Sequence, residues 1–172
     1  MIKNQNRIIS LIVIILYAVI FFKLQASDIA KIQLLNKHYH IKDLKLQDFD
    51  GKFFPLKNKE SKFYIINLWA SWCAPCIKEM KSLDALKKAV PSISVITVSQ
   101  DNDVKDAEEF FIKNKYNNLE KYYDFDKKFI STIKVRGLPT TFIANSKYKI
   151  FAKVEGIIEW DSKIFIEWLY SN

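Results

Sequence analysis

Trp72-Cys73-Ala74-Pro75-Cys76 holds both cysteines of this 172-residue chain, three positions apart. The stretch follows an apolar run, Phe63 to Trp69, that predicts a buried strand. It leads into a helical pattern over residues 77–89, and Pro75 sits near the helix start, where its missing N–H costs nothing. A cysteine at a helix N-terminus faces unpaired backbone N–H groups and the positive end of the helix dipole, which stabilise its thiolate. The two thiols are therefore placed for reversible dithiol–disulfide chemistry.

Two other uses of the cysteine pair are weaker interpretations. A disulfide that closes a four-residue loop restricts the unfolded chain little, so the pair is a poor structural staple. A zinc site needs about four ligands, and His38 and His40 are the only histidines of the chain. These two histidines could in principle join the thiols to hold copper. An alternating pair in a tether is more often solvated, so we expect no metal site.

The N-terminus differs from the rest of the chain. Lys3 and Arg7 precede a 15-residue apolar stretch, residues 8–22, which is typical of a signal peptide or an N-terminal membrane anchor. The length favours a signal, because a spanning helix needs about 20 residues. Leu24 favours the anchor, because a small residue is preferred at that position before a cleavage site after Ala26.

Either alternative exports the remainder of the chain. We expect residues 1–26 to form the anchor or signal, residues 27–43 a tether, with an initial helical turn as the alternative, and residues 44–172 one folded domain. The domain is expected on the periplasmic side of the cell (inner) membrane, anchored through the N-terminus. The alternative is a soluble periplasmic form after cleavage near Ala26.

The net charge is +8 at neutral pH, of which +3 comes from the N-terminal residues Lys3, Arg7 and Lys23. The remaining positive charge is scattered among acidic residues, and Arg136 is the only arginine after residue 7. A basic stripe of the kind that binds nucleic acid is absent from the sequence. We therefore expect no nucleic-acid partner, and we expect a monomer.

The order of patterns predicts an α/β fold. Asp50-Gly51 is a strong turn signal inside a hairpin over residues 44–56. Asp103 and Asp161 are the expected N-caps of two later helices. After the first strand and helix, the expected elements are a strand, a helix, a short strand with a short helix, a second hairpin and a last helix, at residues 93–98, 103–115, 122–135, 140–154 and 161–169. Such an order gives a mixed sheet with helices on both faces.

This order and the stretch Asn67-Leu68-Trp69-Ala70-Ser71-Trp72-Cys73-Ala74-Pro75-Cys76 resemble the thioredoxin fold. The closer resemblance is to exported thiol:disulfide oxidoreductases of the TlpA/ResA type. Lys78-Glu79-Met80 looks like the start of that family's active-site helix, and Gly137-Leu138-Pro139-Thr140-Thr141-Phe142 is similar to its cis-proline loop. The resemblance implies a thioredoxin-like mixed sheet with an N-terminal β-hairpin extension and an insertion before the cis-proline loop. Lys81 departs from the family, which commonly has a helix-kinking proline there.

The resemblance implies how the cysteines act. Cys73 is the expected nucleophile, and Cys76 resolves the mixed disulfide that Cys73 forms with a partner. The redox-active Cys73–Cys76 disulfide takes the place of a cofactor. Pro139 is expected to follow a cis peptide bond, which leaves the backbone of Leu138 free to pair with a substrate strand.

The remaining site residues surround this pair. Trp72 and Thr140 are expected to bind substrate together with the Leu138-Pro139 loop. Glu79 follows Cys76 by one helical turn, where a partly exposed carboxylate raises the thiol pKa and relays protons, unless it is an ordinary solvated helix residue. Three further residues are expected to support the site structurally: Asn67, Trp69 and Pro75.

The expected function is reduction of disulfides in exported proteins, of the cytochrome c or copper-oxidase assembly type. A membrane electron donor would recharge the dithiol. One alternative is a copper-binding assembly factor, but such proteins have the wider C-x-x-x-C spacing and a distant histidine. A second alternative, a net disulfide oxidase, differs from the reductase only in its reduction potential.

Overall fold

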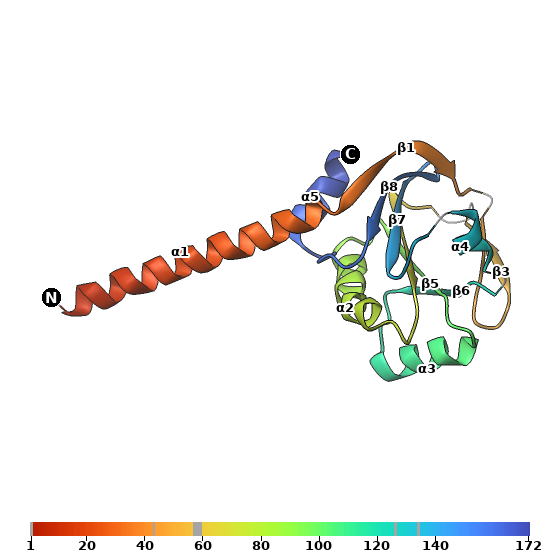
Figure 1. Ribbon diagram of the computed structural model, residues 1–172, viewed down its shortest axis with the longest axis horizontal. Helices are drawn as coiled ribbons and strands as arrows, with labels where there is room; N and C mark the ends of the chain where they lie inside the picture. Colours follow the sequence, from red (N-terminus) through yellow and green to blue (C-terminus); the bar gives the residue numbers. More distant parts are fainter. Residues whose placement is uncertain (1, 43, 57–59, 126, 134) are drawn as a thin grey trace.

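A single mixed sheet forms the centre of the computed structural model, which describes residues 2–42, 44–56, 60–125, 127–133 and 135–172 (Figure 1). The strand order is β1-β8-β7-β4-β5-β6-β2-β3. The strands are β1 (Ile32–His40), β2 (Lys45–Gln47), β3 (Phe53–Pro55), β4 (Phe63–Trp69), β5 (Ser94–Ser99), β6 (Glu120–Tyr123), β7 (Thr140–Asn145) and β8 (Lys149–Glu155). The helices are α1 (Ile2–Ile29), α2 (Ala74–Ala89), α3 (Val104–Asn114), α4 (Lys128–Thr132) and α5 (Lys163–Ser171).

Strand β4 is the middle of the sheet, and all seven of its residues are buried. It runs parallel to β5 and antiparallel to β7. Its apolar side chains alternate between the two faces of the sheet, so other elements must pack on both faces to shield them from water. Residues of α2, α3 and α5 pack on one face, and Phe129 of α4 belongs to the core on the other. The predicted mixed sheet with helices on both faces is therefore confirmed.

Two further parts of the chain extend this core. Strands β2 and β3 form the antiparallel hairpin, and Gly51 in its turn has a φ of 83°, which a residue without a Cβ adopts at no steric cost. Between β5 and the loop at Pro139 the chain forms α3, β6 and α4. Strand β6 adds to the sheet beside β5 and connects it to the hairpin through β2.

The predicted tether over residues 27–43 is wrong. Helix α1 continues to Ile29, and β1 follows as an edge strand paired antiparallel with β8. The difference arises because the backbone groups of β1 bond to β8, which lies far along the chain. A local sequence pattern does not reveal such pairing. The N-cap expected at Asp161 is also wrong, since the side chain of Ser162 accepts from the backbone N–H of Phe165. Asp103 caps α3 as predicted.

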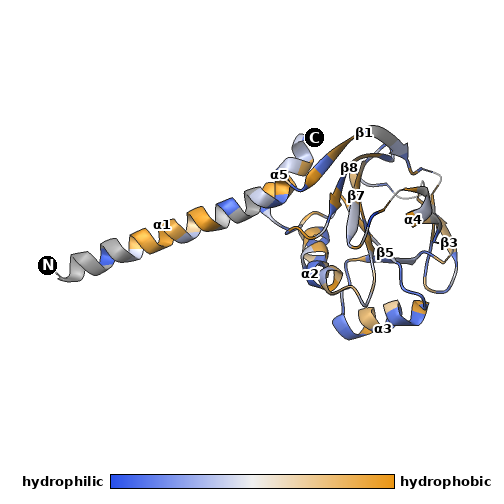
Figure 2. Ribbon diagram, viewed as in Figure 1, coloured by the Kyte–Doolittle hydropathy of each residue, from blue (hydrophilic) through white to orange (hydrophobic). Residues whose placement is uncertain are grey.

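The end of α1 is fixed to the domain. An oxygen of the Asp28 carboxylate accepts a hydrogen bond from the backbone N–H of Glu159 at 3.0 Å. Lys31 Nζ donates to the carbonyl of Ile157 at 2.9 Å, and Ile29 packs against the core under α2 and α5. The earlier part of α1 projects away from the sheet and carries apolar residues along its middle (Figures 1 and 2).

Within the residues that the structure describes, no helix combines the length and apolar character that crossing a membrane requires. The side chains of Lys3, Leu24 and Ala26 lie outside the described residues. The anchor and the signal peptide both stay predictions.

A buried carboxylate holds the loop that joins β4 to α2. Asp101, which follows β5, is fully buried. Its two oxygens accept hydrogen bonds from the backbone N–H of Ser71 at 3.0 and 3.1 Å, and one of them accepts from Ser71 Oγ at 2.8 Å. Ser99 Oγ donates to the second oxygen at 2.7 Å. Because Ser71 precedes Cys73 by two residues, this contact positions the reactive cysteine.

We predict that Asp101→Ala lowers the free energy of unfolding by about 2–4 kcal/mol, because it leaves buried donors without an acceptor. Asp103→Ala is the matched control, since it removes an exposed helix cap and costs only about 1 kcal/mol. Urea unfolding of the oxidised proteins measures both values. A loss for Asp101→Ala no larger than that for Asp103→Ala would contradict the role assigned to Asp101.

Candidate active site

The two cysteines form a disulfide at the N-terminus of α2. Cys73 is the N-cap of the helix, and its sulfur accepts from the backbone N–H of Cys76 at 3.3 Å. Cys76 is fully buried, whereas Cys73 retains a small exposed surface. Cys73 is thus the cysteine that another molecule reaches first, as expected for the nucleophile.

The side chains around the disulfide divide into exposed and buried groups. Trp72 is 67% exposed, although it adjoins Cys73. Trp69 is fully buried, and its ring lies 4.7 Å from the ring of Phe110 and 5.3 Å from that of Phe111. Pro75 occupies the first turn of α2. Trp72 is therefore available to a partner protein, while Trp69 packs inside the core at the end of β4.

The expected cis bond joins Leu138 to Pro139. Thr140 pairs with Leu68 across β7 and β4, so this register places Pro139 beside the end of β4 that leads to the cysteines. The loop is held on both sides of the proline. Gly156 N–H donates to the carbonyl of Pro139 at 2.9 Å, and Thr140 Oγ1 donates to the carbonyl of Gly137 at 2.7 Å.

Glu79 is buried, with only 1% of its surface exposed, so the expectation of partial exposure is wrong. One carboxylate oxygen accepts from Asn67 Nδ2 at 2.7 Å, and the other accepts from Trp160 Nε1 at 2.9 Å. Burial raises the pKa of Glu79 from 4.5 to about 7, and the hydrogen bonds from Trp160 and Asn67 oppose that rise. The carboxyl group can therefore gain or lose a proton near neutral pH.

Asn67 and Trp160 hold this carboxyl group in place. Asn67 Nδ2 also donates to Thr141 Oγ1 at 2.8 Å, across the β4–β7 pair. The Asn67 side chain is fully buried. The indole N–H of Trp160 is a donor that the sequence pattern did not reveal.

Asp101 is the other residue that the sequence interpretation missed. It directly follows a buried strand whose parallel neighbour, β4, leads to the cysteines. The carboxyl ends of neighbouring parallel strands meet at one edge of a sheet. That rule was sufficient to place a polar residue at position 101 near position 71.

The expected solvated histidines lie in β1 and not in a tether. The side chain of His38 lies outside the described residues. Among the side chains that are described, three or more metal-ligating groups do not come together at any point.

The comparisons with known proteins agree with this geometry. The AhpC/TSA family model matches residues 38–153. The thiol-disulfide oxidoreductase ResA of a Bacillus cereus strain is 27% identical over 155 residues, which cover 90% of each chain. ResA of Bacillus subtilis (strain 168) is 31% identical over 112 residues, covering 64% of this chain and 63% of the relative.

Solved structures show the same fold. A thiol:disulfide interchange protein of the DsbE type from Chlorobium tepidum superposes with a TM-score of 0.70 at 21% identity, covering 80% of this chain and 97% of the other. The exposed lipoprotein thioredoxin Etrx1 of Streptococcus pneumoniae gives a TM-score of 0.65 at 26% identity, covering 76% and 99%. The chain therefore belongs to the AhpC/TSA family, as a thioredoxin-like thiol:disulfide oxidoreductase with the Cys73–Cys76 pair.

Proposed function

We propose that the protein reduces disulfides of exported proteins outside the cytoplasmic membrane, of the cytochrome c or copper-oxidase assembly type. The observation that carries this proposal is the Cys73–Cys76 disulfide at the start of α2, beside the exposed Trp72 and above the buried Glu79. No cofactor besides the cysteine pair takes part.

The reaction transfers two electrons. The Cys73 thiolate attacks one sulfur of the partner's disulfide, that S–S bond breaks, and a mixed disulfide forms while the partner's other sulfur leaves as a thiolate. The Cys76 thiolate then attacks the sulfur of Cys73, which releases the second partner sulfur and closes the Cys73–Cys76 disulfide. The two protons of the dithiol end on the two partner sulfurs. A dithiol of a membrane electron donor reverses the sequence and restores the enzyme.

Glu79 acts as the internal proton carrier in this proposal. It follows Cys76 by one turn of α2, and both side chains are buried. With a pKa near 7 it accepts the Cys76 proton and returns it to a leaving thiolate. Its ionised form disfavours a second negative charge nearby, which destabilises the thiolate of the reduced pair. A less stable reduced form is a better reductant, and this favours the reductase over the oxidase.

The proposal of export rests on the N-terminal pattern. The cationic residues Lys3 and Arg7 precede the apolar stretch 8–22. Side chains between Leu11 and Ile20 are exposed in the structure, as expected of a surface that a membrane or an export machinery covers. The similar Etrx1 is itself an exposed lipoprotein.

We expect Cys76→Ser to accumulate mixed disulfides with partner proteins, because Cys73 still attacks and nothing resolves the product. Cys73→Ser is the matched control and should trap none. Non-reducing electrophoresis after alkylation detects the adducts. Equal trapping by both variants would show that the roles are assigned wrongly.

Equilibration of the wild-type protein with glutathione tests the direction of the reaction. A reductant should equilibrate near thioredoxin's roughly −270 mV, whereas a value near −120 mV would indicate an oxidase.

Glu79→Gln should lower the apparent pKa of the thiol pair and slow turnover, because it removes a nearby negative charge and a proton carrier. Wild-type turnover should change with pH around 7, where Glu79 titrates, and the variant should lack that change. Thiolate absorbance and the pH profile of turnover provide the two measurements. Glu167→Gln, which changes an exposed carboxylate, serves as the control. If the curves of Glu79→Gln overlap those of this control, the proton-carrier role is refuted.

For the location, a reporter that folds only outside the cytoplasm should be active when it is fused after Asn172. N-terminal sequencing then distinguishes the two forms, since a start at Ser27 indicates a cleaved signal and an intact start indicates an anchor. A reporter that is active only in the cytoplasm would contradict export.

A further inference from the structure

A groove lies next to the disulfide, between the start of α2 and helix α3. It encloses about 380 Å³. Two of its lining residues flank the cysteines, because Ser71 precedes Cys73 by two positions and Ile77 directly follows Cys76. The other lining residues all belong to α3: Asp106, Glu109, Phe110, Lys113 and Asn114. A protein segment that brings its disulfide to Cys73 therefore has this groove within reach.

The groove has an apolar part on the side of the cysteines. Ile77 is 37% exposed, although it sits in the first turns of α2. Phe110 also lines the groove; it is largely buried, and its ring lies 4.7 Å from the ring of Trp69. Trp72 adjoins the same loop and is largely exposed. These side chains offer a surface for an aliphatic or aromatic residue of a partner.

Negative charge concentrates at this edge of the sheet. The pKa of the Tyr123 hydroxyl is raised, first by burial and then by four aspartates: Asp101, Asp103, Asp106 and Asp124. Tyr123 Oη donates to the backbone carbonyl of Asp101, and Lys127 Nζ donates to the same carbonyl and offsets part of this negative charge. Asp101 also bonds Ser71, which lines the groove. The concentration stands out because the chain as a whole carries +8.

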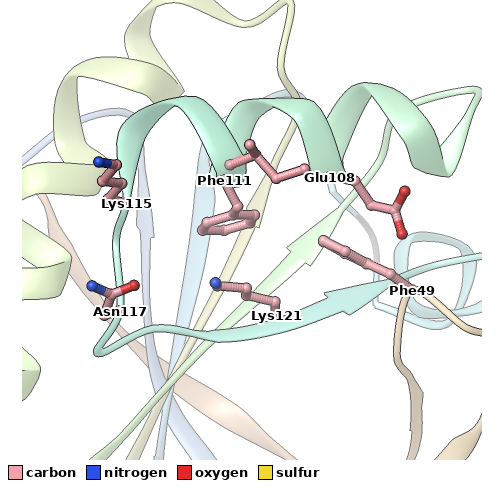
Figure 3. Close-up of a pocket in the computed structure, with 7 residues that line it drawn as sticks. Phe49, Glu108, Phe111, Lys115, Asn117 and Lys121 are labelled. Carbon is pink, nitrogen blue, oxygen red and sulfur yellow. The ribbon is translucent and has the colours of Figure 1, made fainter.

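The opposite side of α3 has a different character (Figure 3). There a second groove is lined by Lys115 and Lys121 beside Glu108 and two aromatic rings. Lys121 Nζ lies 4.8 Å from the centre of the Phe111 ring. In the groove on the side of the cysteines, Asp106 and Glu109 outnumber Lys113. In the groove that faces the β2–β3 hairpin, Lys115 and Lys121 outnumber Glu108. We call the first the acidic groove and the second the basic groove.

From this arrangement we infer that the acidic groove binds a cationic segment of the partner protein, with Lys or Arg next to an aliphatic or aromatic residue near the partner's disulfide. The inference rests on the proposed disulfide reduction and names the substrate class of the same site. Asp106 and Glu109 attract the basic side chains, while Ile77 and Trp72 cover the apolar one. Opposite charges across such a surface mainly speed encounter and select partners.

Two synthetic peptides test this recognition. Each carries one cysteine in a mixed disulfide with 2-mercaptoethanol and a neighbouring leucine, flanked by two lysines in one peptide and by two glutamates in the other. Pre-reduced protein oxidises to its disulfide while the peptide thiol and 2-mercaptoethanol are released. We expect the lysine peptide to reach half-saturation at a roughly fivefold lower concentration than the glutamate peptide at low salt.

The double variant Asp106→Asn, Glu109→Gln should bring the two half-saturating concentrations close together. Glu108→Gln is the control on the other side of the same helix: it removes one carboxylate beside the basic groove, and it should preserve the preference. Higher ionic strength should reduce the preference in the wild-type protein, which provides a test that needs no variant.

The inference is overturned if the wild-type protein treats both peptides alike, or if Glu108→Gln removes the preference as fully as the double variant. Hydroxyethyl disulfide, a small neutral disulfide, separates this failure from failure of the proposed function. A protein that reduces it but does not distinguish the peptides retains its reductase function and lacks the cationic subsite. A protein that does not reduce it fails both proposals.

Discussion

A carboxyl group that is buried inside the core sets the strictest constraint on this fold. Glu79 lies within the protein, and an ionised carboxylate there is costly unless donors surround it. Those donors come from β4, through Asn67, and from the segment before α5, through Trp160. Helix α2 is thereby bound to the centre of the sheet and to the C-terminal part of the chain. The disulfide sits at the end of α2, so the same contacts fix its position.

A second buried carboxylate, Asp101, fixes the other side of the disulfide. It ties the loop before Cys73 to the end of β5, and its carbonyl accepts from Tyr123 and Lys127. The end of β6 and the residues that follow it are therefore connected to the active-site loop through Asp101. The cysteines are held by polar contacts on both flanks, while their sulfur atoms lie against an apolar core.

The sequence alone was sufficient for the parts of the site that depend on local patterns. The cysteine spacing, the strand before it and the Pro139 loop are contiguous motifs, and the structure has each of them where it was expected. Burial of Glu79 and the pairing of β1 with β8 depend on residues that lie far apart in the chain. A solvated helix position and a buried one look alike when lysines flank both. The role of Trp160 depends on the direction of one N–H group, which composition and periodicity do not encode.

The short connection between α1 and β1 has a mechanical consequence. Only two residues, Ala30 and Lys31, separate the helix from the strand, and Asp28 and Ile29 are already fastened to the domain. The connection therefore leaves few residues that could act as a hinge between α1 and the domain. Whatever surrounds the far part of α1 then determines the direction in which the disulfide faces. Under the anchoring that we propose, the disulfide would turn only together with α1, which would limit the directions from which partners approach.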